Sequence, residues 1–65
     1  MTTTLTVEGM SCGSCEATVV DALESVDGVT AAAADHETDS ATAEGDADPL
    51  DLVVAVDEAG YDAQA

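Results

Sequence analysis

The sequence predicts an α+β fold, an open-faced βαββαβ sandwich with two helices on one face of a four-stranded antiparallel sheet. Two observations predict it. Segments with the two-residue period of a half-buried strand and segments with the 3.6-residue period of an amphipathic helix follow one another in that order. The chain has 65 residues, which suits one small domain. We therefore expect a single domain over residues 1–65.

The first strand and the first helix lie on either side of a cysteine-containing loop. In "TTLTVEG", Leu5 and Val7 share one face and threonines the other, which predicts a half-buried strand ending at Gly9. From Cys15 onward the apolar pattern is helical, and Gly28 lies where a helix C-cap is expected. The apolar stripe of this helix is Val19, Ala22, Leu23 and Val26.

The middle of the chain has the pattern of a β-hairpin. Val29 and Thr30 give the first strand a β-branched start, and a polar turn is expected at about residues 36–39. A second strand follows, with Ala41 and Ala43 two positions apart. The alanine run alone would also suit a helix, but its surroundings favour strands.

The second helix is expected to begin at Pro49 and to end at Gly60. Asp48 suits the N-cap, proline suits the first helical position, and Asp51 lies in the first turn. Two apolar stripes compete, and we expect burial of the one without an acidic residue. That stripe is Leu52, Ala55, Val56 and Ala59, and the other is Leu50, Val53, Val54 and Asp57. The final "YDAQA" is a short strand or a frayed end.

This element order is that of the split-βαβ, ferredoxin-like sandwich. In that topology the first loop, the middle hairpin and the last loop share one end of the sheet. These connections carry Cys12 and Cys15, then His36, then Tyr61. We expect His36 to be an exposed or half-packed hairpin residue rather than a metal ligand.

The charge balance is extreme, with fifteen Asp and Glu, no Lys or Arg, and a formal net charge of −15. The carboxylates repel one another unless salt screens them. Regularly spaced apolar residues argue against a disordered acidic tail. The composition is typical of a protein from an extreme halophile, and it predicts unfolding at low salt. A nucleic-acid interface is excluded, because no cationic side chain is present to contact phosphates.

The chain carries no signal for a membrane or for export. No apolar run approaches the length of a membrane span, and "MTTTLTVEG" lacks a basic n-region and an apolar h-region. We therefore expect a cytoplasmic protein without membrane insertion, whose cysteines are reduced. A start at Met and an end just after the last element favour a free protein over an excised domain.

The two cysteines, Cys12 and Cys15, are the only ones and lie at a strand-to-helix junction. The partial positive charge of the helix N-terminus favours thiolates, most of all at Cys15. Two close, soft thiolates suit Cu(I). One chain with two cysteines cannot form a closed zinc cage or an iron–sulfur cluster. An inert or oxidised pair and a thiol–disulfide redox pair remain alternatives.

The stretch "GMSCGSC" resembles the GMxCxxC motif of the heavy-metal-associated (HMA) domain family. The resemblance continues through Gly28-Val29, Ala43-Glu44-Gly45-Asp46 and Gly60-Tyr61-Asp62, and covers nearly the whole chain. It implies a ferredoxin-like domain that serves as a soluble copper chaperone or as an N-terminal module of a metal-transporting P-type ATPase.

The same resemblance implies roles for the residues of the loop. Cys12 and Cys15 would be the metal ligands, and Met10 a buried support of the loop. Tyr61 would stand near the site from the last loop. The remaining residues around the metal would be Ser11, Gly13 and Ser14.

The function implied is that of a Cu(I) metallochaperone and not of an enzyme. One copper ion would pass by ligand exchange to the metal-binding domain of a copper-transporting P-type ATPase. Zinc-preferring members tend to add a carboxylate beside the first cysteine, whereas Ser11 and Gly13 flank Cys12 here. Alternatives are an HMA module for Zn, Cd or Hg and a transporter domain. A thiol–disulfide redox module is disfavoured, because a thioredoxin-like fold needs a longer chain and normally a cis-proline beside the cysteines. The single proline of this chain, Pro49, lies at a helix start instead.

The chain departs from the family in two ways. Ala32, Ala34 and Ala43 stand where many members have Val or Ile, which implies an underfilled core. It also lacks the basic residues that steer many copper chaperones to acidic partners. We expect recognition by short-range packing and by the metal bridge. We also expect a monomer, with a copper-bridged dimer as an alternative.

Overall fold

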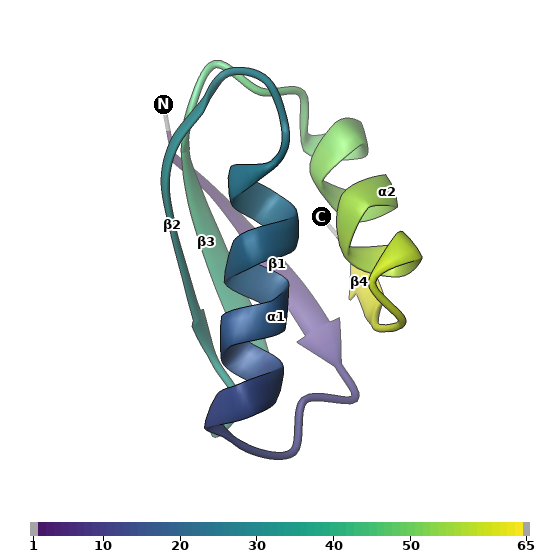
Figure 1. Cartoon of the computed structure of the whole chain (residues 1–65). Coiled ribbons are helices and arrows are strands. Elements are labelled where there is room, and N and C mark those ends of the chain that lie inside the picture. Colours follow the sequence, from purple (N-terminus) through teal and green to yellow (C-terminus); the bar gives the residue numbers. More distant parts are fainter. Residues whose placement is uncertain (1, 65) are drawn as a thin grey trace.

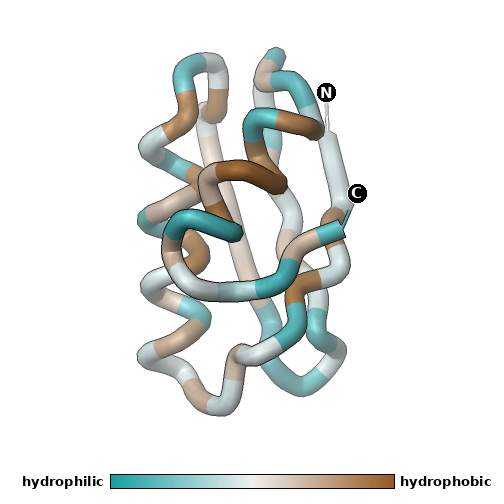
Figure 2. The backbone as a smooth tube through the Cα atoms, turned by 90° about the vertical axis from the view of Figure 1, so that its right-hand side faces the viewer, coloured by the Kyte–Doolittle hydropathy of each residue, from teal (hydrophilic) through white to brown (hydrophobic). Residues whose placement is uncertain are grey.

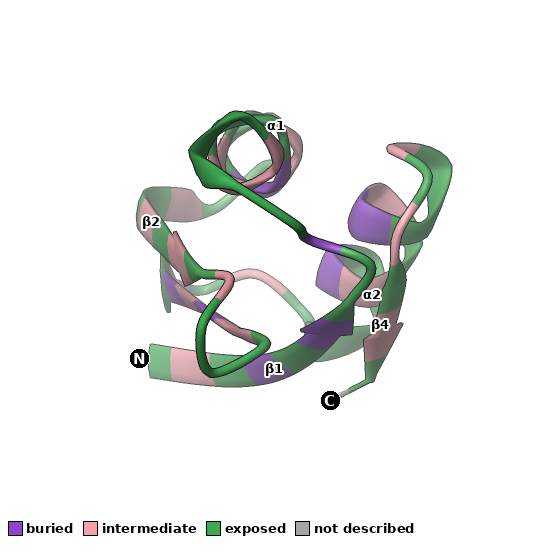
Figure 3. Ribbon diagram, turned by 90° about the horizontal axis from the view of Figure 1, so that it is seen from below, coloured by how far each residue is buried: buried purple, intermediate pink, exposed green. Residues whose placement is uncertain are grey.

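The computed structural model describes residues 2–64 and has the predicted element order. Its antiparallel sheet has four strands in the order β2-β3-β1-β4. Both helices cover the same face of this sheet, so the predicted open-faced sandwich is confirmed (Figure 1 and Figure 3). The elements are β1 (Thr2–Glu8), α1 (Gly13–Glu24), β2 (Val29–Asp35), β3 (Ser40–Gly45), α2 (Pro49–Glu58) and β4 (Asp62–Gln64).

The core lies between the sheet and the two helices. Leu5 and Val7 of β1 are buried there, as their alternation with threonines predicts. On α2, Leu52 and Val56 of the predicted stripe are buried and its two alanines are half-buried, while Leu50 and Val54 of the competing stripe are 67% and 49% exposed. The buried residues are Leu5, Val7, Met10, Val19, Leu23, Ala41, Ala43, Leu52 and Val56.

The end of α1 differs from the prediction. The helix ends at Glu24 with Ser25 as its C-cap, so Gly28 is not the C-cap and Val26 lies beyond the helix. The Ser25 hydroxyl donates a hydrogen bond of 2.6 Å to the carbonyl of Ala22. Such local bonds from serine to the backbone compete with further helix formation. Gly28, at φ 97°, turns the chain into β2 instead.

Helix α2 has the ends that its sequence predicts. The Asp48 carboxylate accepts a hydrogen bond of 2.9 Å from a backbone N–H of the first turn. At the other end, the Gly60 N–H donates to the Asp57 carbonyl (3.0 Å) and the Tyr61 N–H to the Val56 carbonyl (3.3 Å). With Gly60 at φ 101°, this is a Schellman motif. The motif fixes the direction in which Tyr61 leaves the helix.

Hydropathy varies over short distances along the chain (Figure 2). Apolar segments are brief and are interrupted by polar ones, as expected for strands and helices with one buried face each. Among residues 2–64, neither helix is long and apolar enough to cross a membrane.

Candidate metal centre

The two cysteines lie where the loop after β1 becomes α1. Cys12 is the N-cap of the helix, and its carbonyl accepts hydrogen bonds from the N–H groups of Cys15 (3.1 Å) and Glu16 (3.2 Å). Helix α1 therefore begins at Gly13, two residues before the predicted start. Within the described chain, the Cys12 side chain makes no capping hydrogen bond. The first N–H groups of the helix remain available to a negative charge nearby.

The loop is anchored on one side and open on the other. Met10 is only 6% exposed and packs in the core, as its predicted supporting role requires. Cys12 is exposed and Cys15 half-buried, and neither forms a disulfide within residues 2–64. A Cβ added at Gly13 would meet no described atom within 4 Å. The chain is therefore open on this side of Gly13, next to the exposed Cys12. The other loop residues, Ser11 and Ser14, are also exposed.

The surroundings of Cys15 stabilise its thiolate form. Its pKa is lowered to about 6, and the largest cause is a hydrogen bond from the backbone of Ser11. The hydroxyls of Tyr61 and Ser11 lower this pKa further, and the Ser11 Oγ lies 3.7 Å from the Cys15 Sγ. Above pH about 6 this side chain is therefore a thiolate, the form that binds metals. The direction of the pKa shift is the expected one, but its main causes are hydrogen bonds from Ser11 and Tyr61 rather than the helix N-terminus.

Tyr61 joins the site from the loop that follows α2. Its ring packs against the loop before α1, since a Cβ added at Gly9 would lie 3.4 Å from the ring carbon Cδ1. A hydrogen bond to Cys15 is the main reason why the pKa of Tyr61 is raised. Tyr61 therefore packs on the loop and also stabilises a thiolate, which confirms its expected place near the site.

The reactivity of Cys15 tests this arrangement. In a Cys12→Ser variant, Cys15 is the only thiol, and we expect its alkylation rate to rise with a midpoint near pH 6. Adding Tyr61→Phe keeps the ring and removes the hydroxyl, so the midpoint should move upward. Thr4→Val, on the exposed face of β1, is the matched control and should leave it unchanged. A midpoint at the ordinary thiol value of 9.0 without Tyr61→Phe would contradict the assignment.

The hairpin reaches the same end of the molecule through His36. The Glu16 Oε2 accepts a hydrogen bond of 2.7 Å from the His36 backbone N–H and lies 2.6 Å from its Nδ1. The backbone bond from His36 is the main cause of a lowered Glu16 pKa, and the bond to Glu16 is the main cause of a raised His36 pKa. His36 is 33% exposed, which confirms the half-packed position.

The contact between Glu16 and His36 is missing from the sequence prediction. Its signal was available in part, because His36 is the chain's single histidine and was expected at the end that carries Cys12 and Cys15. A second contact joins the same hairpin to β1, where the Val7 N–H donates to the carbonyl of Asp39 at 2.8 Å. The expected meeting of three connections at one end is thus confirmed.

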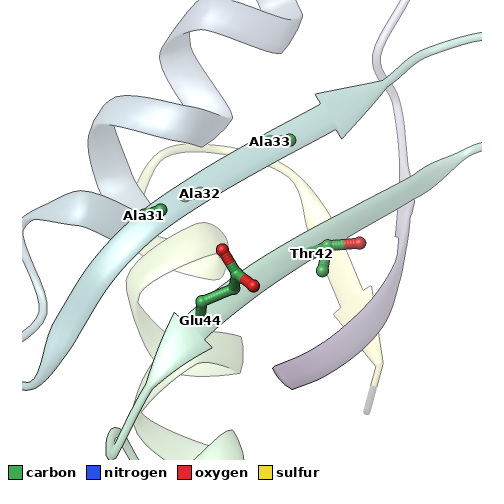
Figure 4. A pocket seen from close by; sticks show the side chains of 5 residues that line it. All are labelled: Ala31, Ala32, Ala33, Thr42 and Glu44. Atoms are coloured by element: carbon green, nitrogen blue, oxygen red, sulfur yellow. The ribbon is translucent and has the colours of Figure 1, made fainter. Parts of the chain in front are cut away.

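A shallow hollow of about 120 Å³ lies along β2 and β3 (Figure 4). Among its lining side chains there is neither a sulfur nor an imidazole, so it does not belong to the cysteine site. The lining residues are Ala31, Ala32, Ala33, Thr42 and Glu44.

Comparison with known proteins places this geometry among metal-binding domains. The profile of the Heavy-metal-associated domain family matches residues 4–62. Copper chaperone CopZ of Staphylococcus aureus (strain MRSA252) is 38% identical over 61 residues, which are 89% of this chain and 90% of that protein. The structure of a CopZ metallochaperone matches with a TM-score of 0.93 and 34% identity, and covers 98% of this chain and 100% of its own.

A domain of a transporter is also similar. The copper binding domain from HMA7, a P-type ATPase, matches with a TM-score of 0.93 and 27% identity. The alignment covers 97% of this chain and 89% of that domain. Chaperones and transporter domains therefore share this fold with the chain.

Proposed function

The chain belongs to the heavy-metal-associated domain family, and on this premise we propose that it is a Cu(I) metallochaperone. Cys12 and Cys15 hold one copper ion in this proposal. The observation that carries it is the Cys15 thiolate, with its pKa of about 6, next to an exposed second sulfur at the start of a helix. Two soft thiolates without further protein ligands suit Cu(I).

The proposed action is ligand exchange and involves no change of oxidation state. A partner thiol loses its proton to solvent, and the resulting thiolate forms a bond to the copper ion held by Cys12 and Cys15. The ion is then three-coordinate and bridges the two proteins. One bond between copper and a sulfur of this chain breaks, and that sulfur can take up a proton. A second partner thiolate then replaces the remaining sulfur of this chain in the same way. The ion passes without being released into water, and no covalent catalysis is needed.

The proposed partner is the metal-binding domain of a copper-transporting P-type ATPase, with both proteins in the cytoplasm. The copper binding domain of the P-type ATPase described above supports a partner of similar shape. Because the chain has no Lys or Arg, we propose that docking uses short-range packing around the open loop. A single domain of residues 1–65 acts as a monomer in this proposal.

A competitive titration tests the metal and the ligands together. Under reducing conditions in molar KCl, we expect one Cu(I) per chain to be taken from a strong chelator. A Cys12→Ser/Cys15→Ser variant should lose more than about a hundredfold in affinity, since even removal of groups behind metal ligands costs about 10–100-fold. A matched Thr2→Ala/Thr4→Ala variant, on the exposed face of β1, keeps both sulfurs and should bind normally. Undiminished Cu(I) binding by the cysteine variant would refute the site.

The same titration decides between metals. Tight Zn(II) binding to the two cysteines alongside weak Cu(I) binding would favour a module for Zn, Cd or Hg. A Cu(I) transfer experiment distinguishes a free chaperone from a transporter domain. When mixed with the amino-terminal domain of a copper ATPase, a chaperone should transfer its Cu(I) within the mixing time. Failure of transfer with intact Cu(I) binding would leave only a storage or domain role.

A further inference from the structure

Outside the cysteine loop, one cluster combines side chains of the kinds that bind metals. Glu16 comes from the first turn of α1, Asp35 from the end of β2 and His36 from the turn after it (Figure 1). One candidate ligand atom from each lies within 4.8 Å of the other two. We infer that Glu16, Asp35 and His36 form a second metal site, which takes a borderline divalent cation such as Zn(II) and is separate from the Cu(I) site.

The donor set differs in kind from that of the cysteine loop. An imidazole suits zinc and its neighbours in the first transition row, and carboxylates suit harder ions. Two carboxylates and one imidazole are therefore a poor match for Cu(I) and a good one for Zn(II). The two sites select different metals for this reason, and the second does not depend on the proposed chaperone function.

The tertiary fold prepares this cluster. Glu16 holds the backbone N–H and the Nδ1 of His36 at 2.7 and 2.6 Å, so the imidazole has a defined position although it is 33% exposed. The Asp35 Oδ1 accepts from the Glu37 N–H at 2.9 Å, which limits the rotation of this side chain.

Formation of the site needs only small movements. A tetrahedral ion with bonds of about 2.0 Å requires ligand atoms about 3.3 Å apart. The exposed Asp35 side chain can close the remaining gap of about 1.5 Å by rotating, once its Oδ1 gives up the hydrogen bond from the Glu37 N–H. The close contact between Glu16 and His36 opens slightly when the ion replaces the shared proton, and that proton leaves to solvent.

The charge of the chain favours a cation at this place. The sequence has fifteen acidic residues and no Lys or Arg. His36 is therefore the only side chain that can neutralise Glu16 or Asp35, and neutral His36 leaves two carboxylates together. A divalent ion removes this repulsion. The other thirteen carboxylates are not grouped with an imidazole among residues 2–64, so a specific site is expected here alone in that part of the chain.

Zinc titration of a thiol-free chain tests the inference. The Cys12→Ser/Cys15→Ser variant removes both sulfurs, and molar potassium nitrate suppresses diffuse cation binding. We expect calorimetry to show one Zn(II) per chain. His36→Gln, whose amide can still bond to Glu16, should weaken binding at least about tenfold, and Asp35→Asn by about tenfold. Asp39→Asn is the matched control in the same turn and should leave the affinity unchanged.

Three other results would contradict the proposed second metal site. No Zn(II) binding by the thiol-free chain does so directly. Equal weakening by Asp35→Asn and Asp39→Asn would show diffuse attraction to acidic residues. If His36→Gln fails to fold, NMR of the thiol-free chain replaces it. Saturating Zn(II) should then shift the imidazole signals of His36, and unshifted signals would refute coordination. Loss of this site leaves the Cu(I) titration unaffected, so the two proposals fail separately.

Discussion

Transfer from molar KCl to dilute buffer is expected to unfold the protein. The chain carries a net charge of −15 and has a radius of gyration of 9.9 Å. Two unit charges about 15 Å apart in water repel by about 0.3 kcal/mol, and there are on the order of a hundred such pairs. The Debye length of about 30 Å at 0.01 M leaves this repulsion in place, while about 3 Å at 1 M removes most of it.

The stability available to oppose the repulsion is small. A folded chain of this size is stable by about 3–10 kcal/mol, and two of the nine core residues are alanines. The unfolded chain relieves much of the repulsion by expanding. Thermal melts followed by circular dichroism at several KCl concentrations measure the effect. A melting temperature that is the same in dilute buffer and in molar KCl would disprove it.

A variant that removes one negative charge tests whether the effect of salt on stability is electrostatic. Glu58 is exposed in the last turn of α2, where the helix end already carries partial negative charge and no basic residue is present. Glu58→Gln should raise the melting temperature at low salt and have little effect in molar KCl. An equal gain at both salt concentrations would point to packing or helix propensity instead of charge.

Gly45→Ala is expected to destabilise the protein by more than about 3 kcal/mol, enough to unfold much of it. Gly45 has φ 126°, a conformation that side chains disfavour. A Cβ at this position would lie 1.9 Å from the carbonyl oxygen of Gly28 and 3.1 Å from the backbone nitrogen of Thr30. These are backbone atoms beside an irregularity in the pairing of β2 with β3, so they cannot rotate away.

Gly60→Ala measures the cost of backbone strain without the steric clash that a Cβ at Gly45 would have with Gly28. Gly60 also has a positive φ, 101°, but a Cβ there would meet no described atom within 4 Å. This variant should lose only about 1–2 kcal/mol, from strain alone. Urea unfolding in molar KCl measures both variants under equal screening. If Gly45→Ala costs no more than Gly60→Ala, the close approach of Gly45 to Gly28 is not a constraint.

Much of the fold follows from local patterns. The strand pattern around Leu5 and Val7 depends on only a few neighbouring residues, and so does the Asp48-Pro49 start of α2. The structure confirms both. The prediction that α1 ends at Gly28 was wrong, because the helix already ends at Ser25, whose hydroxyl bonds to the backbone. A single serine next to an apolar stripe is too weak a sequence signal to outweigh a glycine placed after it.

The candidate site also has one part that the sequence determines and another that it does not. The sequence alone determined which sulfurs are present, their spacing and the helix that follows them, since all of these lie within a few residues. Only the tertiary structure decided what acts on the sulfurs. Tyr61 reaches Cys15 from the other end of the chain, and His36 bonds to Glu16 across 20 residues.

Gly45 shows the same division at a single residue. The sequence places it at the end of a strand, within a stretch that resembles the heavy-metal-associated family. The need for glycine there arises from the carbonyl of Gly28, which the pairing of β2 and β3 brings against it. Periodicity and capping report the local preferences of the chain. Contacts between distant residues depend on how the layers pack, and for that reason only the tertiary structure reveals them.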